Sequence, residues 1–322
     1  MNWKNPVATI VALVSLSLTA QPALSVGNSS LVDKRQQALA RAINATAPKN
    51  RSTLLTSVSN LGTKVIDKDP VLKGCIRHDC TLNLGNVRRS DNPPLVYMFG
   101  DSHVEMWIPA VYSALKSKKI ILRVKWTPGC PAAQISLWGI NNGAQYGVKC
   151  DAWREQSMAK VLAAKPDYVI LAERTSTLLT GANQPLDGPT LSAGLQQTIR
   201  YFQSGGAKVI IVGDTPPFEN WLNPGSCVVV NLTALKRCQT TVTSTSPYFQ
   251  SFGSAEALAA RATAANFIDP TWWLCEKKSL RCPAVVDDKV IYIDSSHISL
   301  EASYGLSDLM GAALLPVLKL LK

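Results

Sequence analysis

The stretch Leu95-Val96-Tyr97-Met98-Phe99-Gly100-Asp101-Ser102-His103 runs from five apolar residues straight into a glycine-bounded turn. Asp91-Asn92-Pro93-Pro94 precedes it and marks a break in the chain. The apolar run predicts a buried β-strand, and the pattern over 104–116 predicts a helix after the turn. Ligands of open parallel sheets bind beyond the carboxyl ends of the strands, so the position of Ser102 favours chemistry.

From residue 95 onward, short β-branched runs alternate with helical patterns, which is typical of a parallel sheet with crossover helices. Val169-Ile170-Leu171 and Val209-Ile210-Ile211-Val212 are continuous apolar runs, as in central strands covered on both faces. The sequence therefore predicts a three-layer α/β/α sandwich. The expected strands are 95–99, 120–126, 168–171, 208–212 and 290–293, and the expected helices are 30–47, 104–116, 151–164, 190–204, 255–264 and 299–320.

The N-terminus has the form of a secretory signal peptide. Lys4 supplies positive charge, the apolar stretch 7–18 is too short to span a bilayer, and Ala23-Leu24-Ser25 offers a small-x-small cleavage site. We expect a signal peptide over residues 1–25, with an uncleaved anchor as the alternative, and export to the periplasm, the cell envelope or the medium. Residues 26–94 are expected to form a helical and irregular extension, and residues 95–322 the main domain.

Export favours disulfides over metal ligands or redox centres for the eight cysteines. No CxxC pair occurs, and His78 is the only histidine near a cysteine pair, so the pattern disfavours a zinc site. Nothing in the sequence calls for another metal or a cofactor. Among many possible connectivities, the nearest-neighbour scheme pairs Cys75 with Cys80, Cys130 with Cys150, Cys227 with Cys238, and Cys275 with Cys282.

The composition limits the classes of protein to which the chain can belong. The chain has 322 residues, of which 46% are apolar and 17% charged, and this allows a full core in one large or two small domains. Its formal net charge of +11 favours a location near anionic surfaces such as acidic glycans or lipid headgroups. The basic residues are scattered without interleaved aromatics, which disfavours nucleic-acid binding.

Asp294 and His297 supply the groups that a serine nucleophile needs. They lie between the expected strand 290–293 and the last helix, so that Asp294 could orient His297 while His297 takes the proton of Ser102. Backbone N–H groups at the helix start would stabilise an oxyanion beside Ser102. The alternative is that these residues only cap helices. His103 is one of just three histidines, and we expect it to pack or hydrogen-bond beneath the turn.

These motifs resemble those of the SGNH/GDSL hydrolase superfamily. The closer resemblance is to the SGNH domains fused to bacterial membrane O-acyltransferases that modify envelope polysaccharides. It covers roughly Cys75 to the C-terminus. The residues that carry it are Cys75 to Cys80, 100–107 with Pro109, Cys130-Pro131, Cys150, 166–172 and Asp294-x-x-His297.

The resemblance implies a flavodoxin-like sheet of about five parallel strands, with Ser102 as nucleophile, His297 as base and Asp294 as its orienter. The glycine and asparagine that usually complete the superfamily's oxyanion hole have no clear counterpart. The candidate oxyanion donors are the backbone N–H of Ser102, together with Gly129, Arg174 and Thr175.

The expected function is that of an exported serine esterase or O-acyltransferase that removes or transfers a short acyl group, such as acetyl, on a cell-envelope polysaccharide. The reaction would pass through an acyl-Ser102 intermediate. Transfer would require a separate membrane protein as the acyl donor. The alternative is a non-catalytic glycan-binding or envelope-assembly module that keeps the fold, which the incomplete oxyanion motifs and the basic charge would favour.

Overall fold

The computed structural model describes residues 29–61, 69, 73–75, 78–88, 92–138, 143–175, 180–218, 223–242 and 247–319. The main strands are β1 (Asp79–Leu84), β2 (Leu95–Gly100), β3 (Ile120–Trp126), β4 (Tyr168–Ala172), β5 (Lys208–Val212) and β7 (Asn266–Ile268). The shorter strands are β6 (Gln239–Thr241), β8 (Arg281–Pro283), β9 (Val285–Val286) and β10 (Lys289–Val290). The α-helices are α1 (Ser29–Asn44), α2 (Arg51–Leu61), α4 (Ser102–Leu115), α5 (Ala144–Ala163), α6 (Gly188–Ser204), α7 (Pro224–Val230), α8 (Pro247–Thr263), α9 (Thr271–Leu274), α10 (Leu300–Gly305) and α11 (Ser307–Leu318). Two short 3-10 helices are η1 (Lys73–Cys75) and η3 (Leu235–Arg237).

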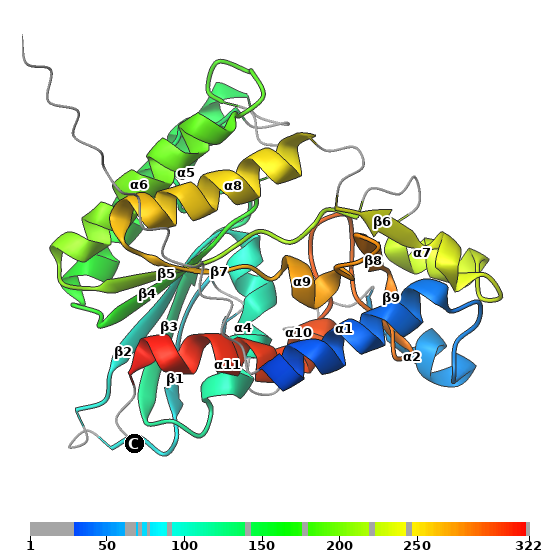
Figure 1. Ribbon diagram of the computed structural model, residues 1–322. Coiled ribbons are helices and arrows are strands. Elements are labelled where there is room, and N and C mark those ends of the chain that lie inside the picture. Colours follow the sequence, from blue (N-terminus) through cyan, green and yellow to red (C-terminus); the bar gives the residue numbers. More distant parts are fainter. Residues whose placement is uncertain are drawn as a thin grey trace, which may run out of the picture.

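A six-stranded sheet in the order β1-β3-β2-β4-β5-β7 forms the centre of the molecule (Figure 1). The strands from β3 to β7 are parallel, whereas β1 pairs antiparallel with β3 at one edge. All five residues of β4 are buried, as the continuous apolar run predicted. The mostly parallel sheet of the predicted fold class is therefore confirmed, and the antiparallel edge strand is an addition to it.

Helices cover both faces of this sheet (Figure 1). Successive strand residues point to opposite faces, so Phe99 and Leu171 belong to the core under α5, α6 and α8, and Met98 and Ile170 to the core under α4, α10 and α11. The three-layer α/β/α sandwich is confirmed. It places the carboxyl ends of β2, β4 and β5 along one edge of the sheet.

Two predicted elements differ from the structure. Residues 290–293 were expected to form a sheet strand, but Val290 pairs with Val285 in a separate hairpin, and the fifth parallel strand is β7. The run is apolar because Val290, Ile291 and Tyr292 are buried in the core, with Val290 on the strand β10 that contacts α2 and α10. The expected helix 299–320 is divided at Leu306 into α10 and α11.

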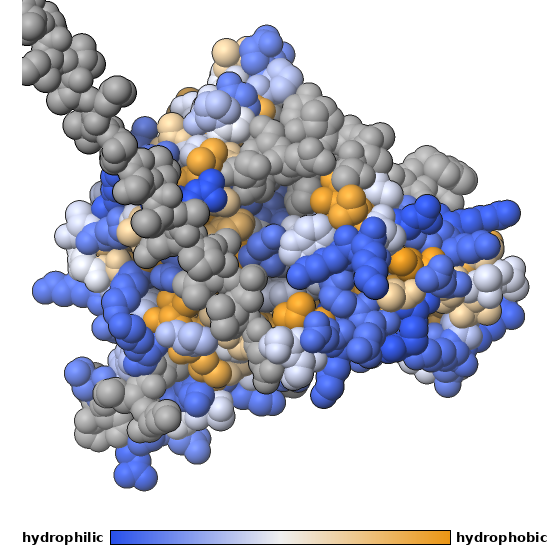
Figure 2. Space-filling model, in the orientation of Figure 1, coloured by the Kyte–Doolittle hydropathy of each residue, from blue (hydrophilic) through white to orange (hydrophobic). Residues whose placement is uncertain are grey.

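The N-terminal helices α1 and α2 pack onto the rest of the chain. Leu39 and Leu54 are fully buried, whereas the outward side of α1 lies in a largely hydrophilic surface (Figure 2). The Asp288 carboxylate accepts hydrogen bonds from the backbone N–H groups of Lys49 and Asn50, at 2.8 and 2.7 Å. Because β1 also lies in the main sheet, the described part of residues 26–94 is joined closely to residues 95–322. The domain boundary at residue 95 stays a prediction.

All four predicted cysteine pairs form disulfides, so the nearest-neighbour pairing is confirmed: Cys75–Cys80, Cys130–Cys150, Cys227–Cys238 and Cys275–Cys282. Each closes a short loop beside the sheet or its helices. Within the described ranges, no helix has the length and apolarity needed to cross a membrane. The predicted signal peptide, residues 1–25, lies outside the described residues.

Candidate active site

Ser102 is the first residue of α4, directly after β2 and the turn Gly100-Asp101. A side chain at Gly100 would collide with the Ala172 carbonyl oxygen, because an added Cβ would lie 2.0 Å from it. Asp101 caps the helix: one carboxylate oxygen accepts from the N–H of His103 at 2.8 Å, and the other from the N–H of Arg174 at 2.9 Å. This cap ties the start of α4 to the end of β4.

Ser102, His297 and Asp294 form a continuous hydrogen-bonded line. The Nε2 atom of His297 lies 2.8 Å from Ser102 Oγ, and its Nδ1 lies 2.8 Å from Asp294 Oδ2. Asp294 Oδ1 accepts from the backbone N–H groups of Ser296 and His297, both at 2.8 Å. The structure therefore brings together the three residues that the sequence predicted as a triad, and their catalytic roles remain a prediction.

The electrostatics of Asp294 suit an orienting carboxylate. Partial burial disfavours its charge, but the hydrogen bond and charge of His297 and the two backbone N–H groups outweigh this effect and lower the pKa of Asp294 well below its usual range. With Asp294 ionised and accepting from Nδ1–H, Nε2 of His297 is free to accept the Ser102 proton. The side chain of His297 is 24% exposed, so a substrate can approach this end of the line.

A second histidine–aspartate pair lies directly beneath the first. His103 Nδ1 is 2.8 Å from Asp214 Oδ1, and both side chains are almost fully buried. Burial disfavours both charges, yet their mutual attraction prevails: the pKa of His103 is raised and that of Asp214 is lowered. The rings of His103 and His297 meet edge to face, with centroids 4.8 Å apart. His103 is buried and lies against Asp214, so the prediction that it packs or hydrogen-bonds beneath the turn is confirmed.

Three further buried carboxyl groups surround this pair: Asp101, Glu173 and Glu256. Burial raises the pKa of Glu173 to about 8 and the pKa of Glu256 well above its usual range. It also raises the pKa of Asp101, although two backbone N–H groups oppose the change. The floor of the site is therefore a water-poor layer in which charge is costly.

The loop that carries Asp294 and His297 is held by the segment after β5. Thr215 Oγ1 donates to the Ser296 carbonyl oxygen at 2.7 Å, and the Phe218 N–H donates to the Ser295 carbonyl oxygen at 2.7 Å. Since residues 290–293 are not a strand of the main sheet, these bonds, rather than sheet pairing, bring the loop to the edge where Ser102 lies.

The structure places the predicted oxyanion donors in different surroundings. Thr175 is fully buried, and both its N–H and its hydroxyl donate to Asp214 Oδ2, so both of its donor groups already have an acceptor. The backbone N–H of Arg174 is taken by Asp101, which leaves only its half-buried side chain. Gly129 lies in the turn after β3 with φ +68°. The Ser102 N–H lies at a helix start, where intrahelical partners are lacking.

Asp214, Thr215 and Glu256 were not singled out by sequence reasoning. A usable signal existed for two of them, because Asp214 and Thr215 follow the buried strand β5 after a single glycine, at its carboxyl end. Glu256 lies on α8 and reaches the site only through tertiary packing, where its Oε2 accepts from the Asp214 N–H at 3.1 Å.

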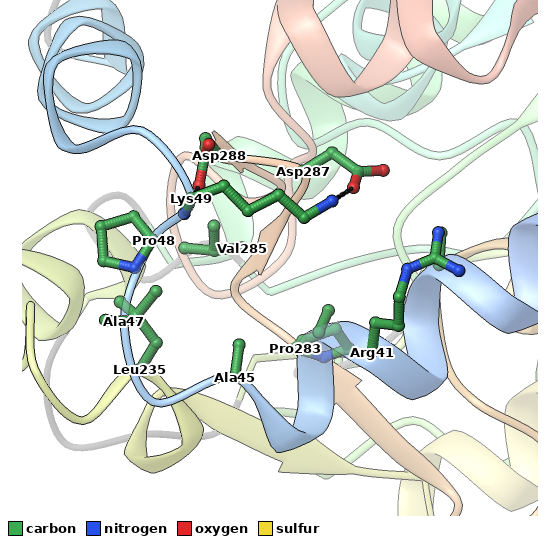
Figure 3. A pocket seen from close by; sticks show the side chains of 12 residues that line it. Arg41, Ala45, Ala47, Pro48, Lys49, Leu235, Pro283, Val285, Asp287 and Asp288 are labelled. Carbon is green, nitrogen blue, oxygen red and sulfur yellow. Dashed lines mark hydrogen bonds and ion pairs between the residues drawn. The ribbon is translucent and has the colours of Figure 1, made fainter.

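Two surface hollows lie away from the triad. The one in Figure 3, about 50 Å³, separates α1 and the segment after it from the β9–β10 hairpin, and Lys49 and Asp287 form an ion pair at its rim. The other, about 470 Å³, lies between α5, α6 and the loop after β3. Neither is lined by Ser102, Asp294 or His297.

Comparisons with known proteins agree with this architecture. The family model described as "SGNH domain (fused to AT3 domains)" matches residues 66–311. Among solved structures, the chain is similar to a lipopolysaccharide acetyltransferase periplasmic domain from Salmonella ser. Paratyphi A, with a TM-score of 0.56 and 14% identity, covering 90% of this chain and 98% of that chain. No curated protein matches the chain.

Weaker similarities, with TM-scores below 0.5, are found to other solved structures. A GDSL-like lipase from Bacteroides thetaiotaomicron has a TM-score of 0.42 and 13% identity, covering 70% of this chain and 87% of that chain. An acetylxylan esterase from Geobacillus stearothermophilus has a TM-score of 0.39 and 13% identity, covering 70% and 94%. At such identities the solved structures bear on the fold alone.

Proposed function

Because the chain belongs to the family of SGNH domains of the type fused to AT3 domains, we propose that it is a serine-dependent esterase or O-acyltransferase acting on an acylated cell-envelope polysaccharide. Family and fold support an acyl-transfer or esterase role. The observation that carries the proposal is the pair of 2.8 Å contacts that His297 makes, one to Ser102 and one to Asp294. Helix capping alone would require neither contact.

In the proposed reaction, His297 Nε2 takes the Ser102 proton as Oγ attacks the ester carbonyl carbon. The carbonyl oxygen becomes an oxyanion, which the Ser102 N–H and the positive end of α4 stabilise, with Gly129 or the Arg174 side chain as further candidate donors. The tetrahedral intermediate collapses, His297 returns the proton to the leaving alcohol, and acyl-Ser102 remains. Water or a sugar hydroxyl then attacks the acyl carbonyl, and the same proton transfers regenerate Ser102.

The substrate and location are also proposals. The signal-peptide form of residues 1–25 and the similarity to a periplasmic domain support export. The lipopolysaccharide acetyltransferase and acetylxylan esterase among similar structures favour a short acyl group, such as acetyl, on a glycan. Since the family is of the AT3-fused type, transfer would take its acyl group from a membrane acyltransferase.

The test uses the purified protein, p-nitrophenyl acetate and a serine-directed phosphonate. We expect slow release of p-nitrophenol and one phosphonate adduct on Ser102, both absent in Ser102→Ala. Absence of labelling and of Ser102-dependent turnover would overturn the proposal and favour a non-catalytic glycan-binding module. An acetylated glycan with and without an acceptor sugar then separates hydrolysis, which releases acetate, from transfer, which produces an acetylated acceptor.

A further inference from the structure

Ser102 and His297 lie 195 residues apart in the sequence, yet two routes connect them. The first is the direct contact of 2.8 Å between Ser102 Oγ and His297 Nε2. The second runs beneath the site through buried side chains, and the reaction proposed above makes no use of it.

The buried route contains three non-covalent contacts. His103 follows Ser102 in the chain, and its Nδ1 lies 2.8 Å from Asp214 Oδ1. The same oxygen accepts from the N–H of Thr215 at 2.7 Å. Thr215 Oγ1 donates to the carbonyl oxygen of Ser296 at 2.7 Å, and Ser296 precedes His297. Together with the direct contact, these steps close a ring that holds nucleophile and base.

Asp214 is held in place by several hydrogen bonds besides those of the ring. Its other oxygen accepts from the N–H and the hydroxyl of Thr175, at 2.8 and 2.9 Å, and its own N–H donates to Glu256. It lies close behind the central strand β5, whose Ile210 and Val212 are fully buried. A carboxylate with so many fixed partners cannot change rotamer without breaking several hydrogen bonds at once.

Thr215 is the step that reaches the loop carrying the base. This loop has no partner strand in the main sheet, and only the bonds from Thr215 and Phe218 tie it to the segment after β5 within the described residues. Its Ser296 is buried, while His297 remains partly open to solvent. A displacement of Ser296 would therefore move His297 directly, because the two residues are adjacent.

We propose that Asp214 and Thr215 are positioning residues that hold Ser102 and His297 at reacting distance through His103 and Ser296. Neither residue is accessible to substrate, since both are buried beneath the site. Their loss should therefore lower kcat and leave KM unchanged. The inference rests on the proposed function, because it concerns the geometry of that reaction.

The test compares Thr215→Val, which keeps the shape but removes the hydroxyl, with Thr215→Ser, which keeps the hydroxyl. We expect Thr215→Val to lower kcat for p-nitrophenyl acetate by about 10-fold at unchanged KM, because small misplacements of reacting groups cost one to two orders of magnitude in rate. Thr215→Ser should restore the wild-type rate. Phosphonate adducts counted at completion give the number of folded sites, so kcat is expressed per site.

Thr198→Val is the matched control. Thr198 is fully buried on α6, and its hydroxyl donates to a backbone carbonyl oxygen, that of Ala132, at 2.6 Å. This variant loses the same type of bond elsewhere in the core, so we expect the wild-type kcat per site. Asp214→Asn removes the charge and replaces one of the two acceptor oxygens by an NH2 donor, and it should lower kcat by about 100-fold at unchanged KM.

The outcomes separate the two proposals. A wild-type protein without Ser102-dependent turnover would refute the proposed function. An active wild type with equal kcat in Thr215→Val and Thr215→Ser would refute the positioning role and leave the proposed function intact. A rise in KM with unchanged kcat would equally refute it, because it would indicate contact with substrate.

Discussion

Two histidine–aspartate pairs lie side by side in this protein, and burial separates their roles. In both, a ring Nδ1 lies 2.8 Å from a carboxylate oxygen. The side chains of His297 and Asp294 are 24% and 51% exposed, whereas those of His103 and Asp214 are only 1% and 2% exposed. Only His297 has its Nε2 on the hydroxyl of Ser102.

The difference shows that the pairing of histidine with aspartate does not by itself define a base. A base must exchange protons with a substrate, and His297 has the exposure and the partner for this. The buried pair has no comparable partner for proton exchange, because Nε2 of His103 has no hydrogen-bond partner among the described residues. Its attraction for Asp214 instead holds two segments of the chain together.

The largest effect is expected when the exposed pair, His297 and Asp294, loses its histidine. His297→Gln removes the proposed base, so kcat/KM for p-nitrophenyl acetate should fall by about 10⁴-fold, while thermal unfolding should stay near that of the wild type because the side chain is partly exposed. Steady-state kinetics and calorimetry measure the two quantities. A variant that retained activity would remove His297 from the triad.

The second prediction concerns the loss of the aspartate from the buried pair, His103 and Asp214. Asp214→Ala leaves His103 buried without its counter-charge, and this should lower the free energy of unfolding by about 3–5 kcal/mol. Asp294→Ala is the matched variant in the exposed pair, and it should cost only about 1–2 kcal/mol, because solvent screens the charge while two backbone N–H groups lose their acceptor. Urea unfolding measures both. Equal losses would show that burial does not distinguish the pairs.

Stability measured over a range of pH extends the comparison to one buried carboxylic acid, Glu173. Burial raises the pKa of Glu173 from its ordinary value of 4.5 to about 8, so the folded protein keeps a proton that the unfolded chain releases. Its contribution to stability is full below about pH 4.5 and is lost as the pH rises to about 8.

Glu173→Gln cannot ionise, and its amide oxygen can still accept from the Ala133 N–H. Between pH 5 and pH 8 the wild type should therefore lose up to about 3 kcal/mol of stability relative to this variant. Chemical unfolding at both pH values measures the difference. Parallel pH dependences would mean that Glu173 is ionised in the folded protein.

The smallest expected effects concern two adjacent aspartates of the β9–β10 turn. Asp288 is buried and caps the segment before α2, so Asp288→Ala should cost about 1–2 kcal/mol. Asp287 pairs with Lys49 in solvent (Figure 3), and Asp287→Ala should cost less than about 0.5 kcal/mol. Urea unfolding tests both, and a larger loss for Asp287 would contradict the burial argument.

Much of the fold could be predicted from local pattern. The apolar runs of β2, β4 and β5 are continuous because these parallel strands are buried on both faces, whereas β3 alternates buried and half-buried residues. β7 was missed because three residues are too few to produce a pattern. The run 290–293 was wrongly predicted to be a strand of the main sheet, because burial of Val290, Ile291 and Tyr292 in the core gives the same apolar composition as a buried strand.

The candidate site was predictable where a motif is compact. Ser102 follows a strand and a glycine turn, and Asp294 and His297 lie within one short loop. The sequence places Thr175 at a strand end without showing where its side chain points. Its hydroxyl turns inward to Asp214, and so cannot face a substrate.

Local sequence patterns were enough to predict the alternating α/β order, the cysteine pairs and the segments that hold the triad candidates, because each depends on residues close together in the chain. Which histidine meets Ser102 and which meets Asp214 is visible only in the folded molecule, since those contacts join segments more than a hundred residues apart. Packing sets how far each pair is buried, and burial sets whether a carboxylate and an imidazole can act on a substrate or only hold the site together.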